Sequence, residues 1–388
     1  MSSSSLSPLV PGATLGMLGG GQLGRMFTIA ARNMGYKVIV LEPDTGSPAG
    51  QLADKHIIAA YDDADALVQM AEQCDVITTE FENIPADVLN KLAETVPVHP
   101  AAEAVEKAQD RIVEKAFILS CGLLPVPYGV INTSSDIADA VKDLSFPAIL
   151  KTARFGYDGK GQQTINSADE VEAAYKETGQ VACVLEQRID LDCEISVVLG
   201  RNQHGESHCF PVSENIHKDG ILYQSICPAN VDQNIITAAQ AAAKRLADKL
   251  EYVGVLAVEF FVTKQGELLV NEMAPRTHNS GHFTIDACLT SQFEQQVRMV
   301  CGLPFGDSKL LSPVVMTNML GDLWINSNNE MAQPKWQKIL ENRSTKLHLY
   351  GKAEARKGRK MGHFCTLADS AEDAQLQAEV IFNSLAAD

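Results

Sequence analysis

Residues 255–272 read VLAVEFFVTKQGELLVNE, two apolar runs separated by a short polar segment. This pattern predicts two adjacent antiparallel strands joined by a tight turn. With a two-residue turn at Gln265-Gly266, Glu259 faces Glu272 across the hairpin and both side chains share one face. The register depends on this turn, because a three-residue turn moves one of the two glutamates to the other face.

Two carboxylates held side by side among apolar neighbours repel each other and destabilise the hairpin unless a cation lies between them. Carboxylate oxygens and substrate phosphates together are the usual ligands of Mg²⁺ on nucleotide enzymes. We therefore predict that Glu259 and Glu272 bind a magnesium ion. The alternative is a pair of exposed glutamates on a solvated face.

The chain around this hairpin, from residue 147 to about 274, is rich in short apolar runs. Such a segment predicts an α+β domain built on antiparallel strands. Besides the hairpin, the predicted strands are 148–150, 181–185 and 195–199, and one long alanine-rich helix spans 235–250.

The N-terminal segment instead alternates strands and helices, which predicts a parallel sheet covered by helices, an α/β arrangement. The predicted strands are 14–18, 37–41 and 75–79, and the predicted helices are 25–34, 64–73 and 103–122. The last helix is amphipathic and closes the first domain. We expect three domains: residues 1–108, residues 109–305 with a lid at about 123–190, and a small C-terminal unit, 306–388, that ends in a helix from about Ser370.

The first strand is followed by Gly19-x-Gly21-x-x-Gly24, and Glu42 ends the next strand. This is the dinucleotide fingerprint, in which glycines let the backbone approach a pyrophosphate and the acid binds a ribose. A helix N-terminus presents free N–H groups to any anion, so we favour a ligand other than NAD. A plain tight turn is the remaining alternative.

A second glycine-rich segment, GYDGKGQ at 156–162, follows Lys151 at the end of a predicted strand. Such a loop can fold over a ligand and turn its N–H groups toward phosphate oxygens, with Lys151 and Lys160 adding positive charge. Its spacing is not that of a Walker A loop, and a hairpin turn with solvated lysines is the alternative. Further on, the backbone of 184–189 either pairs with an adenine edge or simply ends a strand.

Arg276 and His278 come directly after the hairpin. The guanidinium is a planar fork suited to carboxylate or phosphate, and the imidazole can donate a hydrogen bond or shuttle a proton. His278 and His282 have the spacing of a metal pair, but Gly281 argues against a helix there and we do not expect zinc.

Seven lysines and arginines gather in the 18 residues 343–360, opposed only by Glu354. A charge cluster of this kind is either a solvated face or a binding site. In the second case Lys352 and Arg359, on a loop flanked by glycines, form a phosphate site.

The overall charge is acidic, with 32 Lys and Arg against 49 Asp and Glu and a net charge of −17. General binding to nucleic acid or to an acidic membrane is therefore not expected. No apolar run approaches the roughly 18 residues that span a bilayer, and the start of the chain lacks the features of a secretory signal, so we expect a cytoplasmic protein. The nine cysteines contain no C-x-x-C pair and are interpreted as reduced core residues.

The order of these features resembles the ATP-grasp superfamily, and within it the N5-carboxyaminoimidazole ribonucleotide synthetase family. The resemblance covers nearly the whole chain and is carried by six motifs, GGGQLGRM at 19–26, TEFEN at 79–83, GYDGKGQ at 156–162, EFF at 259–261, NEMAPR at 271–276 and HLYGK at 348–352. One departure is Thr277, where the family pattern has proline.

The resemblance implies an N-terminal Rossmann-like pre-ATP-grasp domain, a two-lobed ATP-grasp domain and a small C-terminal domain. It implies an ATP-dependent ligase that carboxylates 5-aminoimidazole ribonucleotide in purine biosynthesis, with carboxyphosphate made from bicarbonate, and that works as a cytoplasmic homodimer. Glu259 and Glu272 would hold Mg²⁺. The implied ATP contacts are Arg111, Lys151, Gly156, Tyr157, Asp158, Gly159, Lys160, Gly161, Gln162, Glu186, Gln187, Arg188, Ile189, Glu194, His217, Asn271 and Glu272.

The remaining site residues implied by the resemblance belong to the other reactants. Those for the ribonucleotide are Gln22, Leu23, Glu80, Lys352 and Arg359, and those for the reacting groups are Arg276, His278, Tyr157 and Asp158. Asp158 is the candidate proton acceptor for the amine, and a substrate-assisted route is equally open.

Three other functions are weighed against this one. A sister ATP-grasp ligase would attach formate to glycinamide ribonucleotide, but Tyr157-Asp158 and the loop from Lys352 to Arg359 favour carboxylation. If the protein were an NAD-dependent oxidoreductase, the acids at 259 and 272 would have no role in the reaction. A non-catalytic nucleotide-binding protein would normally lack a metal acid or a lid lysine, and none is missing here.

Overall fold

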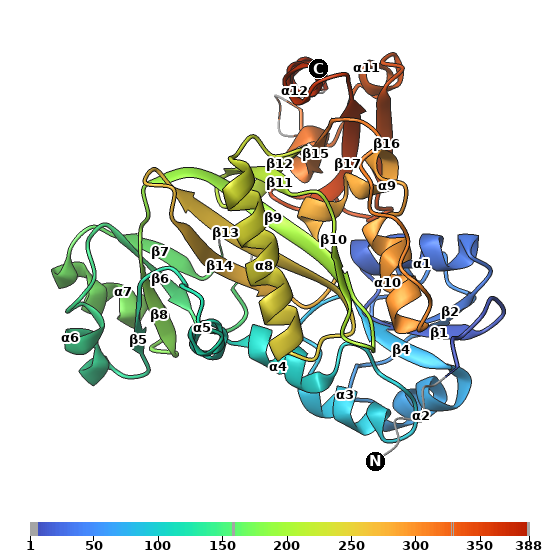
Figure 1. The fold of residues 1–388 in the computed structure, drawn as a ribbon, viewed down its shortest axis with the longest axis horizontal. Coiled ribbons are helices and arrows are strands. Elements are labelled where there is room, and N and C mark those ends of the chain that lie inside the picture. The colour runs from blue at the N-terminus through green and yellow to red at the C-terminus, as the bar shows by residue number, and fades with distance from the viewer. Residues whose placement is uncertain (1–6, 157–159, 327, 329, 386–388) are drawn as a thin grey trace.

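The computed structural model describes residues 7–156, 160–326, 328 and 330–385. Its described strands form three sheets: the N-terminal sheet, the lid sheet and a large central sheet that includes the C-terminal strands (Figure 1). Within the described residues, no helix combines the length and the apolar character needed to cross a membrane. All nine cysteines are free, and seven of them are buried.

The N-terminal sheet has four parallel strands in the order β3-β2-β1-β4, which confirms the predicted α/β arrangement. Its elements are β1 (Thr14–Leu18), α1 (Gln22–Asn33), β2 (Lys37–Leu41), β3 (Lys55–Ile57), α2 (Ala64–Gln73), β4 (Val76–Thr79) and α3 (Ala86–Ala93). The glycine turn lies between β1 and α1, at the carboxyl edge of the sheet.

The single helix predicted over 103–122 is wrong, because the chain forms two helices there, α4 (Ala102–Gln109) and α5 (Arg111–Ser120). Asp110 between them has an extended backbone (φ −132°, ψ 117°), and its carboxylate accepts the N–H of Ile112 at 2.9 Å. Aspartate is favoured at such an N-cap because it satisfies a free N–H of the new helix. The break places Arg111 in the first turn of α5.

The lid is a four-stranded antiparallel sheet in the order β5-β8-β6-β7. It contains β5 (Tyr128–Ile131), α6 (Ile137–Ala140), β6 (Ala148–Thr152), β7 (Gln162–Ile165), α7 (Val171–Glu177) and β8 (Cys183–Gln187), with short 3₁₀ turns at Ser134–Asp136 and Ala168–Glu170. The strand predicted at 181–185 begins two residues later, since Val181 is half exposed and precedes the pairing.

The central sheet has nine strands, eight of them in the order β14-β13-β9-β11-β12-β15-β17-β16 with β10 beside β9. Its first elements are β9 (Leu191–Arg201), β10 (Ser207–Cys209), β11 (Ser213–Lys218), β12 (Ile221–Cys227), α8 (Gln233–Lys249), β13 (Gly254–Thr263), β14 (Leu268–Ala274), α9 (Thr284–Ala287) and α10 (Gln292–Val300). The later elements are β15 (Val314–Leu320), α11 (Gln337–Leu340), β16 (Thr345–Leu349), β17 (Lys360–Leu367) and α12 (Ala371–Ser384), with 3₁₀ turns at Asn279–Gly281 and Gly321–Trp324.

The C-terminal strands extend this sheet, because β15 pairs with β12. Helix α12 begins after Ser370, as predicted, and the Ser370 hydroxyl accepts the N–H of Asp373 at 3.1 Å. The domain limits at residues 108 and 305 stay predictions.

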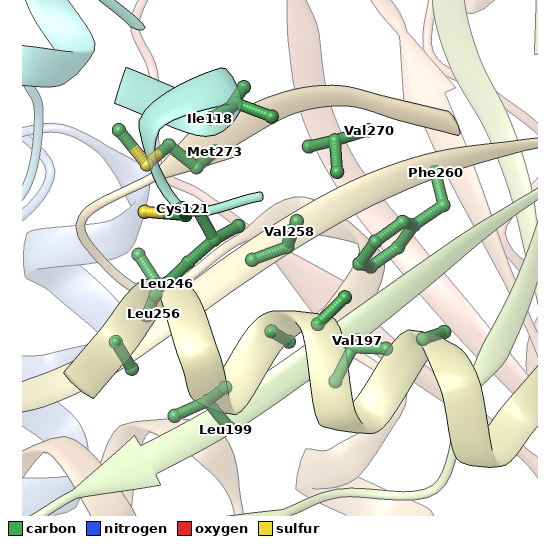
Figure 2. Close-up of a cluster of buried hydrophobic side chains, with 14 of the residues drawn as sticks. Ile118, Cys121, Val197, Leu199, Leu246, Leu256, Val258, Phe260, Val270 and Met273 are labelled. Atoms are coloured by element: carbon green, nitrogen blue, oxygen red, sulfur yellow. The ribbon is translucent and has the colours of Figure 1, made fainter. Parts of the chain in front are cut away.

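Helix α8 covers one face of the central sheet, and the side chains between them form the largest part of the core (Figure 2). Alternate residues of β13 point into this core, among them Leu256, Val258 and Phe260. Glu259 and Phe261 lie between them in sequence and line a cavity on the opposite face. The alternation of β13 therefore separates the core from the site.

The two-residue turn predicted at Gln265-Gly266 is wrong. Thr263 N–H donates to Glu267 O at 2.9 Å, so three residues form the loop, and the last of them, Gly266, has φ 79°. The shift that this longer loop introduces is cancelled further along, because Phe260 pairs with Val270 whereas Glu259 pairs with Glu272. Asn271 is the extra residue of a β-bulge, so the facing glutamates are confirmed, although by a route that the sequence pattern did not contain.

Candidate active site

A cavity of about 740 Å³ lies between the N-terminal sheet, the lid, the central sheet and the loop that follows β16. It brings together predicted residues from every part of the chain. Those that line it are Gln22, Leu23, Glu80, Arg111, Lys151, Gly156, Lys160, Gln162, Glu194, His217, Glu259, Asn271, Glu272, Arg276, His278, Lys352 and Arg359.

Other predicted nucleotide contacts are placed differently. Tyr157, Asp158 and Gly159 lie outside the described residues. The residues that are described but do not line the cavity are Gly161, Glu186, Gln187, Arg188 and Ile189. The backbone N–H groups of Gln187 and Arg188 donate to Pro127 O and Pro147 O, at 2.9 and 3.0 Å, so these two donors serve the lid rather than an adenine edge.

The acid pair Glu259 and Glu272 lines the cavity. Burial, and then the charge of Glu272, raise the pKa of Glu259 to about 7. Arg111 Nη1 lies 3.2 Å from Glu272 Oε2 and is the counter-charge of that acid. The described residues hold no cluster of three or more His, Cys, Asp or Glu of the kind that encloses a metal. Two facing carboxylates nevertheless fit Mg²⁺, which keeps further positions for water and phosphate oxygens.

The β-bulge has a direct consequence for the acid pair. In a regular strand Asn271 and Glu272 would point to opposite faces. Here both line the cavity, while Val270 before them packs in the core under α8 and Met273 after them packs in that core and also borders the cavity. The bulge therefore adds an amide to the acid pair without turning an acid away.

Glu114, which the sequence motifs did not single out, supports the outer edge of β14. It is buried in α5 and accepts the N–H of Met273 at 2.6 Å. Burial, and then the charge of Glu272, raise its pKa to about 8. The only sequence signal was its position three residues after Arg111 on a helix that borders the lid.

Glu186 acts through two lysines. Its carboxylate lies 2.6 Å from Lys151 Nζ and 2.9 Å from Lys115 Nζ. Burial alone would raise its pKa, but the two ammonium groups outweigh burial and lower the pKa to about 2. In this structure Glu186 holds Lys151 at the cavity wall, and its role as a nucleotide contact stays a prediction.

A second polar pair lies on the neighbouring strands β9 and β11. Glu194 Oε2 is 2.9 Å from His217 Nδ1. Burial lowers the pKa of His217, and the stronger effect of Glu194 raises it above its usual value. Both residues line the cavity beside Glu259, as expected for groups that meet a polar ligand.

The contacts of His278 favour one tautomer. Its Nδ1 lies 2.9 Å from the Ser280 hydroxyl and 3.8 Å from Glu259 Oε1, and its contact with the N–H of Ser280 at 3.3 Å favours a ring proton on Nε2. Burial, and then the charge of Arg276, lower the pKa of His278 well below its usual value. The neutral ring is therefore suited to donating one hydrogen bond and not to serving as a general acid.

The N-terminal glycine turn already holds anions of the chain itself. Gly21 and Gly24 donate their N–H groups to the carboxylate of Glu80, the latter at 2.6 Å. Gly20 N–H donates to Glu42 Oε2 at 2.8 Å. The expectation that these N–H groups serve a ligand phosphate is corrected by these contacts, because the position is filled by side chains.

Positive charge comes instead from the loop after β16, residues 350–359. Lys352 Nζ donates to Gln22 Oε1 at 2.7 Å and to Lys360 O at 2.6 Å, which joins the C-terminal strands to the glycine turn. Arg359 Nη1 donates to Glu354 O at 2.7 Å and keeps the loop compact. Arg356 and Lys357 of the same loop also line the cavity, and the sequence analysis had not given them a role.

Comparison with known protein families gives three matches in chain order. Residues 12–109 match the ribonucleotide synthetase preATP-grasp domain, residues 117–293 the ATP-grasp domain, and residues 314–377 the phosphoribosylaminoimidazole carboxylase C-terminal domain.

Whole proteins of known name are similar over nearly the full length. N5-carboxyaminoimidazole ribonucleotide synthase of Bacillus subtilis is 46% identical over 369 residues, 95% of each chain. The crystal structure of an ADP complex of N5-carboxyaminoimidazole ribonucleotide synthetase matches with a TM-score of 0.90 and 43% identity over 97% of each chain. The Aspergillus clavatus enzyme, in complex with ADP and 5-aminoimidazole ribonucleotide, matches with a TM-score of 0.87 and 28% identity over 96% of this chain and 98% of that one. The chain therefore belongs to the N5-carboxyaminoimidazole ribonucleotide synthase family of ATP-grasp enzymes.

Proposed function

We propose that this chain carboxylates 5-aminoimidazole ribonucleotide to N5-carboxyaminoimidazole ribonucleotide, with ATP and bicarbonate as co-substrates, in purine biosynthesis. One observation carries the proposal: a single cavity joins an acid pair, the lid lysines, an arginine–histidine pair and a basic loop. Each of these groups can bind one charged part of the reactants.

The first step is phosphoryl transfer. A bicarbonate oxygen attacks the γ-phosphorus of ATP, the bond to the β-phosphate oxygen breaks, and carboxyphosphate and ADP form. Lys151 and Lys160 on the lid side and Arg111 on α5 supply the positive charge that such a transfer needs. Mg²⁺, held by Glu259 and Glu272, would neutralise phosphate charge when bound.

The second step is attack by the amine of the ribonucleotide on the carboxyl carbon of carboxyphosphate, or on CO₂ released from it. The C–N bond forms, inorganic phosphate leaves, and the nitrogen loses one proton. Asp158 is our candidate acceptor, with Tyr157 beside it, and the leaving phosphate is the alternative. Arg276 and His278 Nε2–H would hold the one-carbon group during both steps.

The ribonucleotide would lie between the glycine turn and the loop 350–359. Gln22, Leu23 and Glu80 border that end of the cavity, and Lys352 and Arg359 offer the cations for a 5′-phosphate. A closed lid would keep water from carboxyphosphate, which hydrolyses readily.

The test is ADP release by the full chain with ATP, bicarbonate and one acceptor at a time. Release should rise strongly when 5-aminoimidazole ribonucleotide is added and should require bicarbonate. Stimulation by glycinamide ribonucleotide with formate instead would reassign the enzyme to the sister ligase.

We also infer a cytoplasmic homodimer with domain limits near residues 108 and 305, supported by the family resemblance. Light scattering of the purified chain tests the dimer, and a mass of one chain would contradict it.

A further inference from the structure

Arg276 is joined to a residue from the other end of the fold. Its Nε lies 2.6 Å from Glu82 Oε2, and its Nη2 donates to Glu82 Oε1 at 3.4 Å. The two residues are 194 positions apart: Glu82 follows β4 of the N-terminal sheet, and Arg276 follows β14. The contact is a two-point pairing of carboxylate and guanidinium, which fixes orientation as well as distance.

The pairing determines which edge of the guanidinium stays available. A guanidinium has five N–H donors. Nε and Nη2 each use one on Glu82, and Nη1 uses one on Thr277 O at 3.1 Å. Among the contacts of the described residues, this leaves one N–H on each terminal nitrogen of Arg276. Two such donors match two oxygens of a planar bicarbonate or of the carboxyl end of carboxyphosphate.

Glu82 keeps its charge in this position. Burial raises its pKa, but the attraction of Arg276 outweighs burial and leaves the pKa below its usual value. Its side chain is 27% exposed and that of Arg276 is 18% exposed, so the pair is largely shielded from water. A shielded ion pair holds its geometry better than an exposed one.

The backbone around Glu82 is fixed by a third residue, Gln109, at the end of α4. Gln109 Nε2 donates to Glu82 O and to Ile84 O, both at 2.7 Å. Gln109 Oε1 accepts from Arg154 Nη2 at 3.1 Å, at the base of the lid. Gln109 therefore fixes the backbone from which the Glu82 carboxylate projects. Through Gln109 and Glu82, the base of the lid is connected to Arg276.

We propose that Glu82 is a positioning residue for the carboxylation: it acts through Arg276, whose remaining N–H edge it turns toward bicarbonate and the nascent carboxyphosphate. This inference rests on the proposed function. It assigns to Glu82 no contact with ATP or with the ribonucleotide.

The test compares Glu82→Ala, Glu82→Gln and Arg276→Ala in the full chain by ADP release with each substrate varied in turn. Glu82→Ala should lower kcat/KM for bicarbonate by about 100-fold, as expected for a misplaced catalytic group, with KM for ATP and for the ribonucleotide within about twofold. Glu82→Gln retains one acceptor of the same shape and should lose less. The double variant Glu82→Ala/Arg276→Ala should be no worse than Arg276→Ala, because residues that act as one unit are not additive.

Glu294→Ala is the matched control, since it removes the partner of Arg298 on α10, another arginine–glutamate pair at 2.8–2.9 Å, outside the cavity lining. It should leave all three KM values unchanged. If Glu82→Ala does not fold, the same comparison is made with Glu82→Gln and the double variant Glu82→Gln/Arg276→Ala.

The positioning role alone would be overturned by an active parent chain whose Glu82 variants keep a normal kcat/KM for bicarbonate, or by losses at 82 and 276 that multiply. A rise confined to the KM for the ribonucleotide would also overturn it. A parent chain without bicarbonate-dependent ADP release would instead overturn the proposed function, and this inference with it.

Discussion

At the scale of single residues, the site depends on charges that are held in place by specific partners. Glu259 and Glu272 face each other in the cavity lining, and Arg111 provides the nearby positive charge. Glu186 lies behind the lining and contacts two lysines, whereas Glu114 lines the cavity and accepts an N–H from a strand edge. Buried charges of this kind are stable only with such partners.

The proposed metal role gives the first prediction. Glu272→Gln keeps the shape of the side chain but removes the charge that would bind Mg²⁺, so turnover should fall by at least about 100-fold with the fold intact. Steady-state rates at several Mg²⁺ concentrations measure this. Glu267→Gln, at the exposed position that follows the loop of the same hairpin, is the control and should behave as the parent chain. An unimpaired Glu272→Gln would exclude the metal role.

The tautomer of His278 gives the second prediction. Nδ1 is engaged by Ser280, so the useful donor is Nε2–H. A glutamine amide reaches the position of Nε2, whereas an asparagine amide reaches that of Nδ1. His278→Asn should therefore lower kcat by about 100-fold, the typical effect of losing one such donor, and His278→Gln should retain clearly more activity. Equal losses in the two variants would contradict the assignment of the proton.

At the scale of elements, two local irregularities position the site. The β-bulge at Asn271 allows an amide and an acid in succession to line the cavity. A new helix begins after the break at Asp110, so that Arg111 lies beside Glu272. Arg111 Nη2 also donates to Gly156 O at 3.3 Å, which connects this residue to the lid. Both irregularities are local departures from regular geometry. They place side chains in a cavity that distant segments of the chain also line.

The break predicts that a helix cap matters for catalysis. Asp110→Ala removes the cap of α5 and should destabilise the chain by about 1 kcal/mol. Because Arg111 follows directly, the KM for ATP should also rise. Ser370→Ala removes the cap of α12, which does not line the cavity, and should cost a similar stability without any change in KM. Urea denaturation and initial rates test the pair, and an unchanged KM in Asp110→Ala would contradict the coupling.

At the scale of the whole molecule, the cavity exists because distant segments pack together. The core of the N-terminal sheet includes Phe293 and Val297 of α10 and also Tyr350, so that sheet is held against later parts of the chain. Figure 1 shows α10 beside α1. The catalytic groups can therefore come from four regions of the sequence and still share one space.

The same packing buries two histidines, His282 and His363, in a neutral form. For His363, burial and then its neighbour His282 lower the pKa well below the usual value. The unfolded chain takes up a proton near pH 6.5, while the folded chain does so only at much lower pH. The stability that this residue contributes is thus present above about pH 6.5 and is lost as the pH falls below it.

The prediction follows from this sign. Between about pH 7.5 and about pH 5 the free energy of unfolding should decrease, and each such histidine adds a slope of up to about 1.4 kcal/mol per pH unit. In His363→Asn the amide can still form a hydrogen bond with Tyr350 OH. This variant should reduce the slope by up to about 1.4 kcal/mol per pH unit, the contribution of one histidine. The exposed His204→Asn should not change it. Urea denaturation across this pH range is the measurement, and parallel slopes for all three proteins would refute it.

The sequence by itself determined the order of the elements, the parallel N-terminal sheet, the facing acids, the glycine-rich lid segment and the family. These features depend on local periodicity, turn residues and short motifs, which are written along a few neighbouring positions. Even there the turn length was misjudged, and only the compensating bulge restored the predicted pairing.

Only the tertiary structure determined which donor each buried carboxylate contacts. The pairs Glu82–Arg276, Glu114–Met273 and Glu80–Gly21 join residues that are 194, 159 and 59 positions apart. No local pattern specifies such pairs, because they arise when sheets from different parts of the chain pack against one another. A buried carboxylate then takes the nearest donor that this packing brings to it, and that choice sets the geometry of the site.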